Sequence, residues 1–199
     1  MSNRSLVPLY ALLASLSMCL APVAKAADTD EAVLFVAQPR LESALFGAAI
    51  LLVKPIADGG HIGFIVNRPT NMKLGELFPE HEPSKKVADP LFLGGPADFN
   101  RVFALVERHA AAGEGAMQIT PELCLVAEAN AVDHIIEAEA DRARFFLGLV
   151  VWRPGELDEE IERGMWFVDE PDAKLVLRKK TDGLWEELVR RSEARANTI

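Results

Sequence analysis

Apolar residues recur along the chain in short runs that are separated by turn-forming residues, a pattern typical of β-strands joined by tight connections. On this pattern we predict strands at residues 33–37, 48–53, 61–67, 90–97, 102–106, 117–119, 145–152, 166–168 and 175–177. The turn Asp58-Gly59-Gly60 joins the second and third strands, which predicts a hairpin. The chain is therefore expected to be rich in antiparallel sheet.

Helical spacing of apolar residues predicts fewer elements, at 74–78, 130–140, 156–165 and 182–195. The inward-facing positions are expected to be Val132, Ile135 and Ile136 in the second helix, Leu157, Ile161 and Met165 in the third, and Leu184, Trp185, Leu188 and Val189 in the last. Residues 79–90 and 109–116 are predicted to be loops.

The first 26 residues have the layout of a secretory signal peptide. Arg4 precedes an apolar run at 6–21, and Ala24-Lys25-Ala26 supplies a small-x-small cleavage site. We expect cleavage after Ala26, a periplasmic or secreted protein at 27–199 that forms a single domain, and no stable membrane insertion after processing. If translation starts downstream instead, the protein is cytoplasmic.

Charge and cysteine content limit the function classes. Removal of the signal takes away Arg4 and Lys25 and no acidic residue, so the net charge changes from −9 to −11. Such an acidic chain repels nucleic-acid phosphates, and we expect no direct nucleic-acid binding. Cys124 alone remains after processing, so no intramolecular disulfide is possible, and its apolar neighbours predict a buried thiol.

Common catalytic and cofactor motifs are absent, because the sequence has no GxGxxG after a strand, no GxxxxGK[ST], no GxSxG, no HExxH and no CxxC. His134 and Glu137 lie at i,i+3 spacing, but no second pair completes a metal site, and an exposed helix face explains them better. Glu80-His81-Glu82 is interpreted as a polar loop. We expect neither a cofactor nor a metal.

Two loops combine residues suited to binding an anion. Arg68 follows Asn67 at a strand end beside Pro69, where its guanidinium would be held in place for a carboxylate or phosphate. An ion pair with the acidic residues at 156–162 is the alternative that we favour. Gly94-Gly95 is either a tight turn or a backbone nest for an anion.

Four motifs in order resemble the AlgH/YqgE family of bacterial proteins. They are Gln38-Pro39, Gly63 to Pro69 (GFIVNRP), Leu93 to Pro96 (LGGP), and Trp152 to Ile161 (WRPGELDEEI) followed by Trp166. The resemblance covers nearly all of residues 27–199. It implies an α+β fold in which a bifurcated, mostly antiparallel sheet wraps into a pseudo-barrel flanked by helices. The family takes its name from a role in transcriptional regulation of alginate synthesis, and no biochemical activity is established for it.

The chain departs from the family's pattern at several positions. Ser43 to Phe46 replaces an Asp-Pro-x-Phe element, and Gly148 to Trp152 replaces Gly-Tyr-x-Gly-Trp. Glu156 stands where the family has Gln, and Gly164 where it has Asn. Polar groups that could line a site are thereby lost.

These observations favour a non-enzymatic binding or regulatory protein, whose partner is a protein or a small anionic ligand. The candidate binding residues are Asn67, Arg68, Gly94, Gly95, Trp152 and Glu156. The alternatives are a transcriptional regulator that acts indirectly and an enzyme with His61 or Glu156 as base and Arg68 as anion holder.

The signal assignment is tested by measuring the intact mass of the native protein in periplasmic and cytoplasmic fractions of its host. We expect a periplasmic species that begins at Ala27. A cytoplasmic species, full-length or shorter, would contradict export.

Overall fold

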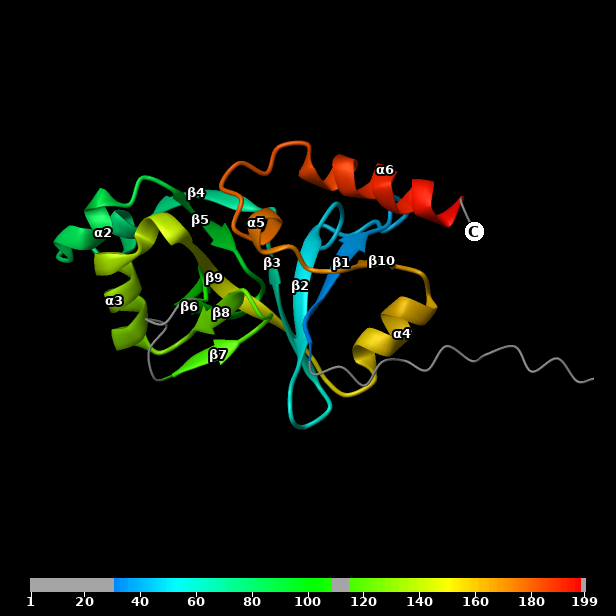
Figure 1. The fold of residues 1–199 in the computed structure, drawn as a ribbon, viewed down its shortest axis with the longest axis horizontal. Helices are drawn as coiled ribbons and strands as arrows, with labels where there is room; N and C mark the ends of the chain where they lie inside the picture. Colours follow the sequence, from blue (N-terminus) through cyan, green and yellow to red (C-terminus); the bar gives the residue numbers. More distant parts are fainter. Residues whose placement is uncertain (1–30, 109–114, 198–199) are drawn as a thin grey trace, which may run out of the picture.

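Ten strands form one curled sheet, and helices cover its faces (Figure 1). The structure is a computed structural model that describes residues 31–108 and 115–197; the expected signal segment and most of the predicted loop at 109–116 lie outside it. The strands are β1 (Val33–Ala37), β2 (Ile50–Pro55), β3 (His61–Ile65), β4 (Pro69–Lys73), β5 (Pro90–Leu93), β6 (Ala97–Glu107), β7 (Ala116–Gln118), β8 (Leu123–Val126), β9 (Ala143–Trp152) and β10 (Trp166–Asp169). The helices are α1 (Leu74–Leu77), α2 (Glu82–Lys86), α3 (Ala129–Ala138), α4 (Glu156–Glu162), α5 (Ala173–Val176) and α6 (Leu184–Ala196), with a 3-10 turn η1 (Ala140–Arg142).

Strand β9 is the branch point of the sheet. One edge of β9 pairs antiparallel with β6. Its other edge is divided between two strands, because β3 pairs with Val150 to Trp152 while β5 pairs in parallel with Phe146 and Leu147. The strand order β10-β1-β2-β3-β9-β6-β8-β7 therefore splits into two arms at β9. This arrangement confirms the predicted α+β fold with a bifurcated, mostly antiparallel sheet.

Three glycines allow the backbones to meet at this branch. Gly148, in the middle of β9, has a φ of +65°, a left-handed conformation that favours glycine. A Cβ atom on Gly94 would lie 2.2 Å from the carbonyl oxygen of Gly148, and one on Gly95 would lie 2.2 Å from the carbonyl carbon of Leu149. Side chains at these positions would push the strands apart, so the branch requires glycine.

Three apolar clusters hold the helices to the sheet. α6 and α5 pack over the β1–β2 arm, as the upper part of Figure 1 shows for α6, and contribute Leu184, Leu188 and Val176 to the largest cluster. α3 packs with Val132, Ile135 and Ile136 buried against the β6–β8 arm, which confirms the predicted face. α4 covers the opposite face of the first arm through Leu157, while Ile161 stays partly exposed.

A buried arginine joins both arms to the C-terminal region. Arg144, at the start of β9, is 1% exposed. Its Nη2 donates to the carbonyl of Val66 at 2.5 Å, and its Nη1 donates to the carbonyl of Val176. The guanidinium lies 3.7 Å from the ring centroid of Phe92, a cation–π contact. Burial lowers the pKa of Arg144 to about 9, and the charge of Asp89 opposes this shift, so the side chain stays positively charged at neutral pH.

The predicted strand at 175–177 is wrong, because these residues belong to or follow α5. The side chain of Asp172 caps this helix by accepting hydrogen bonds from the backbone N–H groups of Lys174 and Leu175. Helix α2 lies within the predicted loop at 79–90, and β4 and β8 were not predicted. In the described part of the chain, no helix is long and apolar enough to span a membrane.

Replacement of Arg144 by alanine is expected to lower the free energy of unfolding by roughly 3–5 kcal/mol. The change removes the donors of two carbonyls and leaves a cavity beside Phe92. Urea denaturation measures the loss. The control is Arg142→Ala on η1, where the side chain is exposed and the expected change is within about 0.5 kcal/mol. A loss below about 1 kcal/mol for Arg144→Ala would show that the buried arginine is not required for the stability of the fold.

Candidate functional site

The side chains of Asn67 and Arg68 hold the segment between β1 and β2. Asn67 accepts from the backbone N–H of Ile50 through Oδ1 and donates to the carbonyl of Ala48 through Nδ2, both at 2.8 Å. Arg68 donates to the carbonyls of Ala44 at 3.0 Å and Gly47 at 2.9 Å. Its guanidinium is thus held by backbone carbonyls, and not by the acidic residues of α4 that the sequence analysis favoured. An anion at Arg68 would have to compete with both hydrogen bonds.

Gly94 and Gly95, for which the sequence left open a tight turn or an anion nest, lie between β5 and β6 in backbone that forms no turn. The backbone N–H of Gly94 donates to the carbonyl of Leu147 at 2.8 Å, and its carbonyl accepts from Ile65 at 2.8 Å. The polar backbone groups of Gly94 are therefore used in joining β5, β3 and β9. The N–H of Gly94 is therefore not free to bind an anion.

Trp152 and Glu156 lie at the other end of β3. Trp152 pairs with His61, the first residue of β3, and its ring packs on Gly63, where an added Cβ would come within 2.9 Å. Glu156 accepts from the backbone N–H of Arg153 at 2.8 Å and so stabilises the start of α4. Asn67 follows the opposite end of the strand. The length of β3 therefore separates Trp152 and Glu156 from Asn67 and Arg68 by on the order of 20 Å. The structure does not bring the six candidate residues together.

His61, His81, His134 and Cys124, which the structure describes, do not assemble a metal site. His134 and Glu137 are exposed on α3, and Oε1 of Glu137 lies 3.6 Å from Nε2 of His81. Burial raises the pKa of the Cys124 thiol, an effect that outweighs the positive charge of Arg108. Within residues 31–108 and 115–197, no group of three His, Cys, Asp or Glu side chains is placed to hold a metal ion.

A cavity of about 740 Å³ lies where the two arms of the sheet curl toward each other. The first arm contributes the start of β1 and the end of β10, and the second contributes the turn between β7 and β8. Its lining is Glu31, Ala32, Val33, Thr120, Pro121, Glu122, Val168, Asp169, Glu170, Pro171 and Arg195. This lining combines apolar side chains with four acidic side chains. Residues far apart in the sequence thus form a single surface depression.

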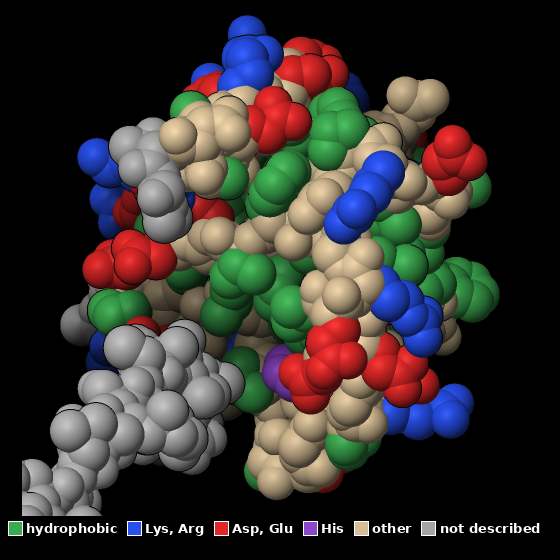
Figure 2. Space-filling model, turned by 90° about the vertical axis from the view of Figure 1, so that its right-hand side faces the viewer, with side chains coloured by type: hydrophobic (Ala, Val, Ile, Leu, Met, Phe, Trp, Pro, Cys, Tyr) green, Lys and Arg blue, Asp and Glu red, His purple; other side chains and the backbone are tan. Residues whose placement is uncertain are grey.

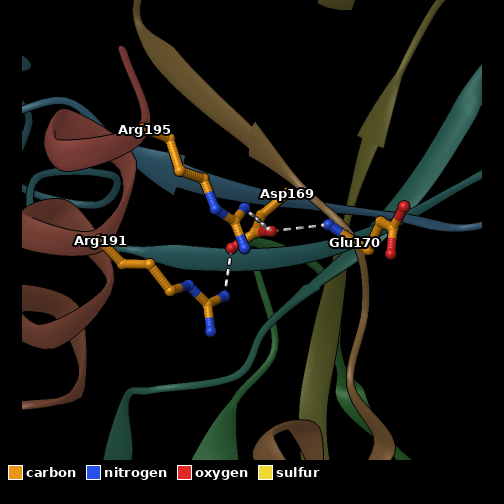
Figure 3. Close-up of polar contacts among 4 residues, drawn as sticks. All are labelled: Asp169, Glu170, Arg191 and Arg195. Atoms are coloured by element: carbon orange, nitrogen blue, oxygen red, sulfur yellow. Dashed lines mark hydrogen bonds and ion pairs between the residues drawn. The ribbon is translucent and has the colours of Figure 1, made fainter. Parts of the chain in front are cut away.

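The floor of this cavity carries a charged cluster (Figure 3). Asp169 is 4% exposed and binds two arginines from successive turns of α6, Arg195 at 2.7 Å and Arg191 in a shorter contact. Its carboxylate also accepts from the backbone N–H of Glu170 at 3.0 Å. Burial acts to raise the pKa of Asp169, but the hydrogen bonds from Arg191 and Arg195 outweigh it and hold the pKa below its usual value. The carboxylate is thus ionised and fully paired at neutral pH.

The edge strand β10 borders the cavity. One of its edges pairs with β1, and the described residues place no strand on the other. Val168 is 58% exposed beside this open edge. Figure 2, which views the side where α4 and the end of α6 lie in Figure 1, shows hydrophobic side chains at the surface with acidic side chains next to them. The features suited to binding are therefore an open strand edge, exposed apolar groups and acidic charge.

This cavity was missed in the sequence, although two local signals point to it. Asp169 ends an otherwise apolar strand, and a carboxylate in such a position needs a cationic partner. Arg191 and Arg195 stand four positions apart, on one face of the predicted last helix. Neither signal identifies Glu31 or Glu122 as neighbours, because the curl of the sheet brings them there.

Replacement of Arg68 by alanine is expected to lower the free energy of unfolding by about 2 kcal/mol, because the carbonyls of Ala44 and Gly47 lose a charged donor. Chemical denaturation measures this loss. The control is Arg153→Ala, whose side chain is 86% exposed and 3.7 Å from Glu156, and whose expected effect is below about 0.5 kcal/mol. Equal stability of the two variants would show that Arg68 does not brace the loop.

Comparison with known proteins agrees with this fold. A family model described as AlgH-like matches residues 34–197. A UPF0301 protein of Chlorobium phaeobacteroides is 29% identical over 160 residues, which cover 79% of this chain and 83% of that protein. A UPF0301 protein of Saccharophagus degradans is 28% identical over 154 residues, which cover 75% of each chain.

Two solved structures share the architecture. The crystal structure of protein DIP2367 from Corynebacterium diphtheriae has a TM-score of 0.68 and 22% identity, and the match covers 82% of this chain and 87% of that one. The solution structure of the AlgH protein from Pseudomonas aeruginosa also has a TM-score of 0.68, with 17% identity and coverage of 84% and 90%. The match of the family model over residues 34–197 establishes that this chain belongs to the AlgH-like family.

Proposed function

We propose that this protein is a non-enzymatic binding protein with a regulatory role, and that it holds a partner protein at the cavity beside β10. The observation that supports the proposal is the combination, in one place, of a cavity of about 740 Å³ with the open edge of β10. An open strand edge offers backbone hydrogen bonds to another polypeptide, and exposed apolar side chains add contact area.

The chemistry of the lining favours binding over catalysis. The deepest polar group, Asp169, is paired with Arg191 and Arg195, so it is a poor base. The other lining carboxylates, of Glu31, Glu122 and Glu170, lie exposed at the rim. Among the described residues of its lining there is no Ser, Cys or Lys side chain beside a histidine, as an activated nucleophile would require.

The enzyme alternative receives less support from the geometry. It needs Arg68 and either His61 or Glu156 at one site. His61 begins β3, Arg68 follows its other end, and the guanidinium of Arg68 already donates to two carbonyls. Indirect regulation of transcription, in contrast, is compatible with a protein that acts by binding another protein.

Site-specific photo-crosslinking in the native host tests the proposal. A photoreactive phenylalanine analogue at Val168, which lines the cavity, is expected to give discrete protein adducts. The matched control places the same analogue at Val151, which is 50% exposed on β9 and does not line the cavity. Absence of adducts at Val168, or equal adducts at both positions, would overturn the proposal.

A further inference from the structure

We infer that the partner segment at this cavity is a basic, extended polypeptide that adds as a strand to the open edge of β10. This inference rests on the proposed function and specifies the chemistry of the partner. Two independent features carry it: the edge of β10 that is open at Val168 and the excess of acidic side chains around the cavity.

The edge of β10 is open at its two middle residues, where Phe167 is half-buried and Val168 is 58% exposed. Exposed edge strands of natural sheets typically carry lysine, proline or a bulge that discourages pairing. β10 reads Trp166-Phe167-Val168-Asp169, with regular register against β1 throughout, and its one charged side chain is turned inward to Arg191 and Arg195. The outer backbone of β10 is therefore accessible to an incoming strand at Val168, while Trp166 and Asp169 at the two ends are buried.

The charge around the edge selects the partner. Asp169 together with Arg191 and Arg195 amounts to a single net positive charge at the floor. Three exposed glutamates, Glu31, Glu122 and Glu170, outweigh it at the rim. Side chains of a strand project to one face at every second residue, so lysine or arginine at alternate positions of the incoming strand would face these carboxylates.

The same acidic side chains disfavour three other molecules that could bind at the cavity. A second copy of this chain would bring the same three glutamates to the interface and carries a net charge of −9. A small anion would meet the rim carboxylates before it reached Arg195. An acidic peptide is opposed for the same reason, so a basic segment is the occupant that the surface fits.

Fluorescence anisotropy with short labelled peptides provides the test. The probe is an end-blocked heptapeptide of alternating lysine and valine, added to the full-length protein and to the form recovered from its host. We expect saturable binding that weakens as the salt concentration rises. A peptide with glutamate in place of lysine is expected not to bind. Equal binding of both peptides would overturn the charge selection.

Charge variants separate a local effect from the overall acidity. The triple substitution Glu31→Gln, Glu122→Gln and Glu170→Gln is expected to weaken binding of the lysine peptide roughly tenfold or more. The matched triple Glu80→Gln, Glu162→Gln and Glu186→Gln removes the same charge from exposed positions outside the cavity, and should leave binding within about twofold. Equal weakening by the two triples would overturn the inference.

Backbone methylation tests strand addition itself. N-methyl groups on every second residue of the peptide remove the backbone N–H donors along one of its two edges. Two such peptides are compared, one methylated on the odd-numbered residues and the other on the even-numbered residues. One of them is expected to bind at least tenfold more weakly than the other. If both bind like the unmodified peptide, no strand is added.

Sedimentation of the protein without peptide tests whether a second copy of this chain occupies the edge of β10. A dimer that is abolished by Val168→Lys would overturn the inference.

The outcomes distinguish this inference from the proposed function. Adducts at Val168 without binding of the lysine peptide would leave a binding protein whose partner is not a basic strand. Absence of both would remove the binding function at this cavity together with the inference.

Discussion

The architecture depends on the close contact between two backbones at Gly94, Gly95 and Gly148. Because none of these residues has a side chain, β5 and β3 can both reach one edge of β9, and the sheet can branch. The branch sets the direction of both arms, and the curl of the arms creates the cavity between β10 and the β7–β8 turn. The location of the proposed binding surface therefore depends on glycine contacts that do not involve the residues lining it.

Arginine side chains support this framework by binding backbone. Arg40 donates to the carbonyl of Gly164 after α4, Arg68 to the carbonyls of the β1–β2 connection, and Arg144 to carbonyls of Val66 and Val176. A guanidinium suits this task because its donors are fixed in one plane and can reach two carbonyls at once. These positive charges are used within the structure, while most carboxylates remain exposed.

The sequence predicts the main strands because each is an apolar run bounded by turn residues. It also predicts the long helices α3 and α6, since their apolar residues recur at helical spacing. Residues 175–177 were misassigned because Leu175, Val176 and Leu177 form a short apolar run, while the helix is set by the cap at Asp172. Helix α2 was missed because it is short and polar. The signal-peptide assignment lies outside the described residues.

The candidate site was less predictable than the fold. Asn67 and Arg68 have the polar groups expected of a binding loop, yet their hydrogen bonds serve neighbouring backbone. The cavity lining comes from residues near 31, 121, 169 and 195, which no local pattern links. Their proximity depends on the twist and branching of the sheet, and these are properties of the assembled strands.

The branch at β9 also has a consequence for the order of folding. Arg144 lies 78 positions after Val66 in the chain, so the first arm remains without its neighbouring strand until the second arm has been synthesised. During this interval β3 has an exposed edge, and the apolar faces of β1 and β2 lack the cover of α4 and α6. Pairing across such a separation is slow, because the entropy of closing a long loop must be overcome first. The nascent chain therefore passes through a stage at which its N-terminal hairpin can associate with other chains or be held by a chaperone.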